Sequence, residues 1–324
     1  MKPIIAVVMG GYSDEYKVSL KSGQLILDSV DRDLYEVYAY HILSDSWTAL
    51  ADGNSYTIDK GDFGFELNGQ KKVPQAIFNI IHGTPGEDGM LQAYWQILGI
   101  PFTGCGHYLS ALTFNKKDCI AVLQKYGISA AKSVYLSEGQ DYQIDKIVEK
   151  VGLPCFVKPN QSGSSLGISK VKKAEDLPQA IDVAFQEDQH ILIESFLDGT
   201  EVSVGVVEWQ GEAFVTGITE IVSHNEFFDY EAKYQGASEE ITPARLDGAT
   251  LQKISDTAIH AYRSLGMSGM SRSEYIMVNG EPHFLEMNTL PGFSPASILP
   301  QQLSHSGISI PEFINAGIAA ILGA

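Results

Sequence analysis

The sequence predicts a protein of mixed α/β and α+β class that begins with an open parallel sheet. In its first third, strand-like apolar runs at Ile4–Met9, Tyr35–His41 and Ala76–Ile81 alternate with helix-like segments, as in sheets flanked by helices. The rest of the chain has short strands and helices without this alternation. With 324 residues, 44% of them hydrophobic, the chain is long enough for two or three domains packed as one globule. We predict three units, at residues 1–108, 109–200 and 201–324.

The N-terminal elements follow one another in a regular order. The strand Ile4–Met9 leads into a helix within Glu15–Val30, and the turn His82–Gly89 opens a helix that runs through Leu98 towards the strand-like Pro101–Thr103. Open parallel sheets bind ligands at the carboxyl ends of their strands. Neither GxGxxG nor a Walker A motif occurs, so the sequence supports neither a dinucleotide nor the commonest phosphate loop.

The middle and last parts contain shorter elements. The middle begins with a helix from Leu109 to Lys125 and ends with a helix over Ala174–Phe185 and a strand at Ile191–Glu194. Three further strands are expected at Ser133–Leu136, Pro154–Lys158 and Ile168–Val171. From Val202 onward we expect strands, a helix over Leu251–Leu265 and a hairpin within Arg272–Asn288.

Composition excludes several functions. The formal net charge of −18 argues against nucleic acid or an anionic membrane as a partner, because both require a basic patch. Cys105, Cys119 and Cys155 are odd in number and widely spaced, without a CxxC, which excludes a disulfide framework or a zinc site and fits a reducing compartment. No signal peptide and no membrane-length segment is present, so we expect a cytoplasmic protein.

The hairpin near the end of the chain carries paired polar groups. Side chains at i and i+2 share one face of a strand, which places Arg272 beside Glu274 and Glu286 beside Asn288. Two carboxylates and an amide oxygen are suitable ligands for Mg²⁺; alternatively, they form only the solvated face of a hairpin. A two-residue Asn279-Gly280 loop would put Glu286 on the wrong face, so we expect an odd-length loop with Gly280 left-handed.

Two segments of the middle unit have features of a nucleotide site. Lys158 ends an apolar strand and precedes a loop rich in Gly and Ser, whose backbone N–H groups could cradle an anion; the alternative is a solvated surface loop. The strand Ile191–Glu194 continues into a short connector ending at Leu197, with Glu201 shortly after. Such a connector can bind an adenine edge and the carboxylate a ribose, although a buried strand with surface acids has the same pattern.

Two further segments could contact a substrate. The stretch from His224 to Tyr234 mixes aromatic and charged residues without a helical or strand period, which indicates either a disordered loop or a segment that closes over a ligand. Glu15 follows the first strand and could receive an ammonium group. Alternatively, it is an acid in the first turn of a helix, favoured by the helix dipole.

Five motifs in order resemble the ATP-grasp superfamily and, more narrowly, the D-alanine–D-alanine ligase family. They are GGxSxExxVSLxS, IHGxxGEDG, KPxxxGSSLGISKV, FFDYEAKY and NTLPGFSPxSILP. The resemblance covers essentially the whole chain, and it implies a three-domain ATP-grasp fold and ATP-dependent joining of two D-alanines for cell-wall peptidoglycan. It also implies a homodimer by analogy.

The resemblance assigns the nucleotide-binding residues. Lys116 and Lys158 are similar to the lysines that contact the ATP phosphates, with the Ser162–Gly167 loop folding over them. The remaining implied contacts are Ser162, Gly163 and Ser165 of that loop, the adenine connector Glu194, Ser195, Phe196 and Leu197, and Glu201 for ribose. Glu274, Glu286 and Asn288 are implied as ligands of two Mg²⁺ ions, which Mn²⁺ could replace.

The resemblance also assigns the substrate contacts. Glu15 would bind the ammonium of the first D-alanine, with Ser164 and Tyr234 hydrogen-bonded to it across the closed site. Lys233 would reach the transferred phosphate, Arg272 and the Gly292 amide would form the oxyanion hole, and Ser297 would take the carboxylate of the second D-alanine. His82 lies in the turn near the substrates.

Two positions depart from the family pattern. Glu274 stands where the family usually has Asp, and Ile120 where many relatives carry a second lysine. Sibling ligases that accept D-lactate, D-serine or an L-amino acid remain alternatives, although Tyr234 favours D-alanine. A catalytically inactive ATP-binding regulator is a more distant alternative; it predicts the loss of metal or oxyanion groups, all of which are present.

Overall fold

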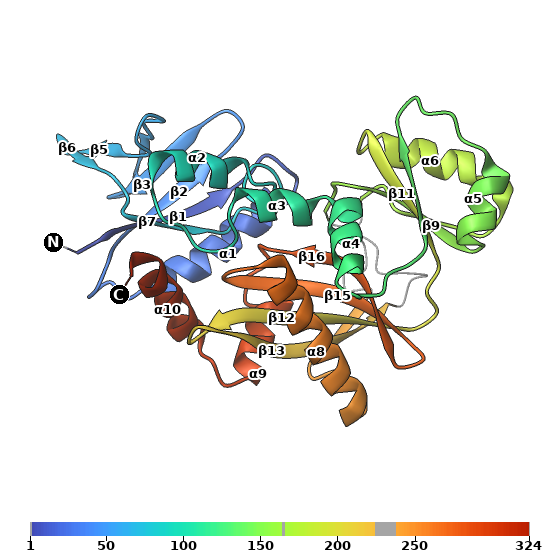
Figure 1. Ribbon diagram of the computed structural model, residues 1–324. Coiled ribbons are helices and arrows are strands. Elements are labelled where there is room, and N and C mark those ends of the chain that lie inside the picture. Colours follow the sequence, from blue (N-terminus) through green and yellow to red (C-terminus); the bar gives the residue numbers. More distant parts are fainter. Residues whose placement is uncertain (1, 164–165, 224–237, 324) are drawn as a thin grey trace.

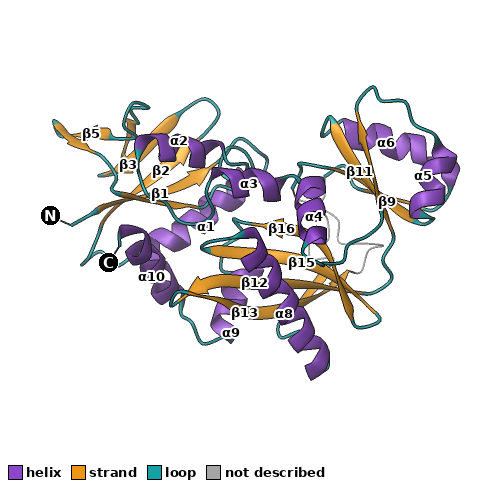
Figure 2. Cartoon of the chain, in the orientation of Figure 1, coloured by secondary structure: helices purple, strands orange, loops and turns teal. Residues whose placement is uncertain are grey.

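The computed structural model describes residues 2–163, 166–223 and 238–323 and contains three main β-sheets with helices packed on them (Figure 1). The predicted contacts of Ser164, Ser165, Lys233 and Tyr234, and the predicted closing segment His224–Tyr234, lie outside these described residues. In Figure 2 the N-terminal sheet, the sheet that contains β9 and β11, and the sheet that contains β12 and β15 surround the helix α4 (Lys116–Lys125).

The N-terminal sheet has the strand order β4-β3-β2-β1-β7. Its strands β1 (Ile4–Gly10), β2 (Glu36–Ile42) and β7 (Ala76–Asn79) are parallel, as predicted. The strands β3 (Trp47–Ala51) and β4 (Asn54–Thr57), which extend the sheet beyond β2, are antiparallel additions that were not predicted. The sheet is therefore mixed rather than purely parallel.

Helices cover both faces of this sheet because its central strand is apolar on both sides. Ile5, Val7 and Met9 pack into the core beneath α1 (Tyr16–Ser29) and α10 (Ile310–Leu322). Ala6 and Val8 face the opposite core, which is formed with α2 (Met90–Leu98). The predicted strand at Pro101–Thr103 forms only a single parallel bridge, between Phe102 and Ile77.

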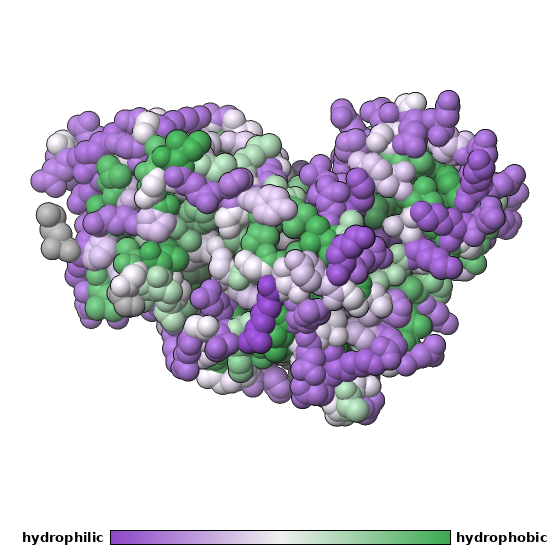
Figure 3. All heavy atoms as spheres, in the orientation of Figure 1, coloured by the Kyte–Doolittle hydropathy of each residue, from purple (hydrophilic) through white to green (hydrophobic). Residues whose placement is uncertain are grey.

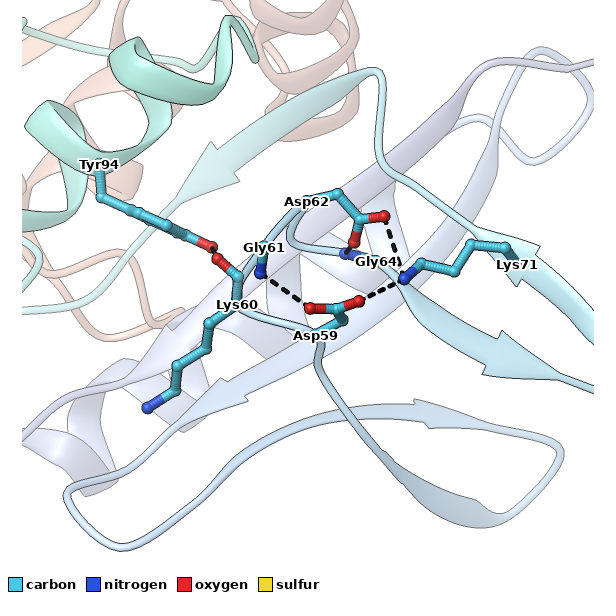
Figure 4. A network of polar contacts seen from close by, with 7 residues as sticks. All are labelled: Asp59, Lys60, Gly61, Asp62, Gly64, Lys71 and Tyr94. Carbon is cyan, nitrogen blue, oxygen red and sulfur yellow. Dashed lines mark hydrogen bonds and ion pairs between the residues drawn. The ribbon is translucent and has the colours of Figure 1, made fainter.

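The hairpin of β5 (Phe65–Leu67) and β6 (Gln70–Lys72) is a second element that was not predicted. Figure 4 shows how a polar network fixes it: Lys71 Nζ lies 2.6 Å from an Asp59 carboxylate oxygen and 3.0 Å from one of Asp62. The Tyr94 hydroxyl donates to the carbonyl of Lys60 at 2.8 Å. These contacts attach the hairpin to α2 through the loop that contains Lys60. Lys71 also balances the charges of the neighbouring Asp59 and Asp62 carboxylates.

The predicted helix from Leu109 to Lys125 is two helices, α3 (His107–Phe114) and α4 (Lys116–Lys125). The break falls at Asn115, whose side-chain oxygen accepts a hydrogen bond from Asp118 N at 3.0 Å. Asparagine favours this helix-capping role because its side chain satisfies a backbone N–H at the helix start. The cap thus fixes Lys116 at the first turn of α4.

The middle sheet is antiparallel, with the order β10-β9-β11-β8. Its core packs against the helices α5 and α6. The helix α5 was not predicted, and a short 3₁₀ turn at Ala174–Asp176 precedes α6. The bounds of its elements are β8 Ser133–Ser137, α5 Ile144–Val151, β9 Cys155–Pro159, β10 Ser169–Val171, α6 Leu177–Phe185 and β11 His190–Ser195.

The last sheet is also antiparallel, with the order β14-β13-β12-β15-β16. Its helix α8 (Gly248–Leu265) shares a core with Val202, Val204 and Tyr275. The helix α9 (Ile298–His305) packs on the other face of β12 and β13. The strands are β12 Thr200–Trp209, β13 Glu212–Ser223, β14 Ser238–Ile241, β15 Met270–Val278 and β16 Glu281–Asn288.

The predicted odd-length loop between β15 and β16 is wrong. Val278 pairs with Glu281, which leaves Asn279 and Gly280 as a two-residue loop with φ of 51° and 78°, as in a type I′ turn. A β-bulge within the ladder, between the Glu274–Glu286 and Tyr275–Phe284 pairs, has the same effect that an odd-length loop would have had. Glu274 pairs with Glu286 but Tyr275 pairs with Phe284, so one residue of β16 is extra and the pleat reverses. Both carboxylates therefore share one face.

Candidate active site

Two adjoining cavities lie beside the β15–β16 hairpin. The first, here the β11 cavity, has a volume of about 470 Å³ and lies between the middle and last sheets. The second, here the α1 cavity, has a volume of about 440 Å³ and is lined by the start of α1, the His82–Glu87 turn and the segment after β16. Lys116, Arg272 and Glu286 line both, so the two cavities adjoin at these side chains.

The β11 cavity contains the predicted connector. Glu194, Ser195, Phe196, Leu197 and Glu201 all line it, together with Lys158. Lys158 Nζ lies 2.6 Å from a Glu194 carboxylate oxygen, and both side chains are buried, with exposed fractions of 9% and 6%. The pairing of β9 with β11 places these side chains near one another. Because the pair is buried, removal of either partner leaves an uncompensated charge.

Aromatic rings line one side of the β11 cavity. The ring centroids of Phe156 and Phe196 are 6.2 Å apart, and Lys170 Nζ lies 4.3 Å from the Phe196 centroid. The apolar side chain of Leu285, the extra residue of the bulge, also lines this cavity. The combination of flat apolar surfaces with a few polar groups suits a heteroaromatic ligand.

Arg272, which lines both cavities, forms an ion pair with Glu274, which lines the β11 cavity. Arg272 Nε donates to Glu274 Oε1 at 2.7 Å, and the fully buried Ser203 hydroxyl donates to the same oxygen at 3.2 Å. Burial lowers the pKa of Arg272, but the charges of Glu274 and Glu286 raise it by more. The guanidinium therefore stays cationic next to both cavities.

Lys116 links the junction to the Gly- and Ser-rich loop. Its Nζ lies 3.3 Å from Glu286 Oε2 and donates to the Ser162 carbonyl at 2.7 Å. Ile120, one turn later on α4, is buried in a core cluster with an exposed fraction of 4%. The position where many relatives have a second lysine thus faces the protein interior.

The oxygens of Glu274, Glu286 and Asn288 suit a hard divalent cation. Glu274 and Glu286 are direct cross-strand partners, and Asn288 is the partner of Arg272. Glu274 lines the β11 cavity, Asn288 the α1 cavity and Glu286 both. In the part of the chain that the structure describes, no group of three or more His, Cys, Asp or Glu could hold a metal, so a cation here needs further ligands from bound phosphate or water.

The α1 cavity brings Glu15 against the Gly- and Ser-rich loop. A Cβ atom added to Gly163 would lie 2.8 Å from Glu15 Oε2, so only glycine allows this close approach. At the other end of the cavity, Ser297 precedes α9, its hydroxyl accepts from Ser294 N at 3.0 Å, and it lies 2.9 Å from the Ser294 hydroxyl. Gly292 lines the cavity next to Ser297.

Several residues near the cavities were not predicted as site residues. Glu87 lines the α1 cavity, and its carboxylate accepts from Gly83 N at 3.0 Å. Burial and the charge of Glu15 raise the pKa of Glu87 to about 8. Glu87 belongs to the quoted IHGxxGEDG motif, which could have pointed to it. Ser203 carries no such signal, because its role depends on strand pairing with Glu274.

Comparisons with known proteins agree with this arrangement. The family model described as D-ala D-ala ligase N-terminus matches residues 4–105, and the model described as D-ala D-ala ligase C-terminus matches residues 122–319. The chain belongs to the D-alanine–D-alanine ligase family. It is 54% identical to the D-alanine–D-alanine ligase of Flavobacterium johnsoniae, over 96% of this chain and 97% of that protein.

Solved structures of the family have the same architecture. The chain matches the VanG D-Ala:D-Ser ligase from Enterococcus faecalis at 30% identity, with a TM-score of 0.88 over 99% of this chain and 100% of that one. It matches the D-alanyl-alanine synthetase A from Vibrio cholerae at 26% identity, with a TM-score of 0.89 over 100% and 99%. The predicted ATP-grasp fold is thereby confirmed.

Proposed function

We propose that this protein is an ATP-dependent ligase that joins two D-alanines into D-alanyl-D-alanine, which is used in the cytoplasm for peptidoglycan precursors. Membership of the family supports this reaction. The observation in the structure that supports it most is the pair of adjoining cavities that share Lys116, Arg272 and Glu286. One cavity suits a nucleotide and the other two small amino acids, and the two shared cationic side chains, Lys116 and Arg272, would lie where phosphate meets carboxylate.

The β11 cavity is the proposed ATP site. Adenine would bind the Glu194–Leu197 connector beside Phe156, and ribose would bind Glu201. Lys116 and Lys158 would contact the phosphates as point charges. The remaining proposed contacts are Ser162, Gly163 and Ser165 of the covering loop and Lys233.

Glu274, Glu286 and Asn288 are the proposed ligands of two Mg²⁺ ions, or of Mn²⁺. When bound, such ions neutralise charge on the transferring phosphate. Arg272 holds the Glu274 carboxylate through Nε, and Ser203 holds the same oxygen. This two-point anchoring fixes the longer side chain that stands where the family usually has Asp.

In the first step, a carboxylate oxygen of the first D-alanine attacks the γ-phosphorus of ATP. The bond from that phosphorus to the β–γ bridging oxygen breaks, and ADP and an acyl phosphate form. Glu15 would hold the ammonium group, and Ser164 and Tyr234 would form hydrogen bonds with Glu15. Lys233 would contact the transferred phosphate. The chain contributes position and charge stabilisation rather than covalent chemistry.

In the second step, the amine of the second D-alanine, whose carboxylate Ser297 would hold, attacks the acyl carbon. A tetrahedral intermediate forms, the bond from carbon to phosphate oxygen breaks, and the amine loses a proton. Arg272 and the Gly292 amide would stabilise the negative oxygen. Preorganised donors of this kind are often the largest single contribution to such reactions.

The same proposal covers organisation. The three units 1–108, 109–200 and 201–324 each contain one of the main sheets, which supports them as domains. A homodimer is proposed by analogy with the family. An inactive regulator is disfavoured because Arg272, Glu286, Asn288 and Gly292 all line the α1 cavity.

The test is phosphate release from ATP with D-alanine, L-alanine, D-serine or D-lactate, with products identified by mass spectrometry. We expect D-alanine alone to support release and to yield the dipeptide. Because the chain resembles a D-Ala:D-Ser ligase at 30% identity, mixtures of D-alanine with D-serine or D-lactate are included. A mixed product in excess over D-alanyl-D-alanine would favour a sibling ligase, and no release with any substrate would contradict the proposal.

A further inference from the structure

The segment from Leu290 to Phe293 carries the proposed oxyanion donor, the Gly292 amide, and belongs to no helix or strand. Its position therefore depends on contacts outside regular backbone pairing. Leu290 and Phe293 are buried, with exposed fractions of 2% and 0%. Both residues form hydrogen bonds with the N-terminal unit, more than 200 positions away in the sequence.

Two side chains make those hydrogen bonds. His82 Nδ1 lies 2.8 Å from the carbonyl oxygen of Leu290, and Phe293 N donates to the Ser22 hydroxyl oxygen at 3.1 Å. Ser22 Oγ in turn lies 3.2 Å from His82 Nε2. Ser22 and His82 thus form one buried bridge that contacts the loop on both sides of Gly292.

The partners determine where the protons lie. A carbonyl oxygen only accepts, so His82 Nδ1 carries a proton. The Ser22 oxygen accepts from Phe293 N and lies beside Nε2; in the neutral imidazole, which burial favours, Nε2 accepts the hydrogen of the Ser22 hydroxyl. Burial lowers the pKa of His82, although the charge of Glu15 acts in the opposite direction. With both nitrogens occupied, His82 has no ring nitrogen left to take a proton from a substrate amine in this arrangement.

We propose that Ser22 and His82 are positioning residues that hold the Gly292 amide at the carbonyl oxygen of the first amino acid. This inference rests on the proposed ligase reaction. The N-terminal unit then contributes more than the binding of the first substrate: it aligns the oxyanion donor that the last unit carries. Such donors lose effect when their supporting contacts allow small displacements.

The test compares Ser22→Ala with Ser19→Ala, a matched control on the same helix. Both serines are fully buried, and each hydroxyl accepts from one backbone N–H and donates to one acceptor. Ser19 accepts from Gly10 N at 2.9 Å and donates to the Ile80 carbonyl at 2.7 Å, so these hydrogen bonds do not go to the Gly292 loop. A general loss of stability should therefore affect both variants alike.

Removing one oxyanion donor outright costs about 100- to 1,000-fold in kcat, so a displaced donor should cost about 10- to 100-fold. For Ser22→Ala we expect a fall of that size in kcat, with unchanged affinity for ATP and a melting temperature close to that of Ser19→Ala. A phosphinic acid analogue of the dipeptide mimics the tetrahedral intermediate, and its affinity should fall in parallel with kcat/KM. Ser19→Ala should keep kcat within about twofold.

A second pair of variants keeps the inference testable if Ser22→Ala does not fold. His82→Asn can keep a donor for the Leu290 carbonyl, whereas His82→Ala cannot, so we expect a smaller loss of kcat in His82→Asn. Equal kcat in Ser22→Ala and Ser19→Ala, or equal losses in the two His82 variants, would overturn the inference. An inactive wild type would contradict the ligase proposal itself, which separates the two failures.

Discussion

Glu286 is the carboxylate on which most of the proposed chemistry depends, because it lines both cavities and lies 3.3 Å from Lys116. Glu286→Gln removes a charge shared between Lys116 and the proposed cations, so turnover should fall by at least about 100-fold. The fold should remain, which thermal melting without nucleotide can verify. Phosphate release at saturating Mg²⁺ is the measurement, and near-normal turnover would show that the metal site lies elsewhere.

Glu274→Asp is the gentler change at the neighbouring position. It restores the residue usual in the family but shortens a side chain that Arg272 and Ser203 hold at one oxygen. Loss of such outer contacts typically costs 10- to 100-fold, so we expect partial activity at roughly a tenth of the wild-type rate. Full activity would show that the longer side chain is not adapted to this site.

Gly163 is required by the closeness of the Glu15 carboxylate rather than by its backbone angles. In Gly163→Ala the added methyl would lie 2.8 Å from Glu15 Oε2, which must then move. Because a flexible side-chain end can give way, stability should change little. The affinity for the first D-alanine should fall about tenfold, as for the loss of one charged hydrogen bond of about 1.5 kcal/mol.

Calorimetric titration of D-alanine, with a non-hydrolysable ATP analogue present, measures this affinity. Gly248→Ala is the matched control, since nothing lies within 4 Å of a Cβ at that position. An unchanged affinity for D-alanine in Gly163→Ala would contradict the assignment of Glu15 to the substrate ammonium group.

Glu87 makes stability depend on pH near neutrality. Burial and the charge of Glu15 raise its pKa from 4.5 to about 8 in the folded protein, so the folded state binds a proton that the unfolded state releases. This contribution to stability is fully present below about pH 4.5 and is lost as the pH rises to about 8. The glutamine of Glu87→Gln cannot ionise. The free energy of unfolding of this variant, measured by urea denaturation, should therefore fall less between about pH 5 and about pH 8 than that of the wild type. Equal falls for both proteins would contradict this prediction.

At the scale of elements, the pair of carboxylates owes its geometry to the bulge in β15–β16. Sequence periodicity correctly indicated that Arg272, Glu274, Glu286 and Asn288 lie together, but the odd-length loop that it predicted is not what brings them together. Asn279-Gly280 forms the two-residue turn that this pair prefers. The extra residue lies instead in the paired part of the hairpin, as a β-bulge in β16. No residue type marks a bulge in the sequence as clearly as Asn-Gly marks a turn. The alternation of polar and apolar residues could therefore not locate the bulge.

The missed strands had a readable signal. Asp52-Gly53 and Asn68-Gly69 are two-residue hairpin loops with positive φ at both residues, and such pairs predict type I′ turns. The helix α5 has only eight residues, too few turns for periodicity to stand out. By contrast, the long apolar strands of the N-terminal sheet could be predicted, because burial on both faces makes them continuous apolar runs.

The packing of α9 on its sheet predicts a test of stability. A Cβ at Gly205 would lie 2.2 Å from Gln302 Oε1 and 2.4 Å from Thr216 Oγ1, and Gln302 is itself fixed by donating to Ser203 O and Thr219 Oγ1. Gly205→Ala should therefore lower the free energy of unfolding by about 1–3 kcal/mol, the usual cost of overpacking. Urea denaturation measures it, with Gly317→Ala in the open surroundings of α10 as a control. Equal stability of the two variants would contradict the packing described.

For the whole molecule, a net charge of −18 makes the few cations at the cavities decisive for anionic substrates. Figure 3 shows a largely hydrophilic face with scattered apolar patches. Within the described residues, no helix is long and apolar enough to cross a membrane. The three cysteines are free and buried, and burial raises the pKa of Cys105 to about 11, so thiol chemistry has no evident part in the reaction.

The arrangement of the three sheets places the candidate active site where no single unit contains it. The last unit supplies the proposed metal ligands, the middle unit the adenine connector, and the N-terminal unit Glu15 and the Ser22–His82 bridge. The motifs in the sequence could identify most of these residues. The bridge could not be predicted, since it depends on how the N-terminal unit docks against Leu290 and Phe293.

The central claim is that the carboxylate of D-alanine attacks ATP at the junction of the two cavities. The most direct measurement is the transfer of ¹⁸O from carboxyl-labelled D-alanine to inorganic phosphate during turnover. Attack on the γ-phosphorus, followed by expulsion of phosphate from the acyl carbon, predicts one ¹⁸O in each phosphate released and one retained in each new peptide carbonyl. Phosphate without label, formed together with dipeptide, would contradict the account, because ATP would then be cleaved without activating the carboxylate.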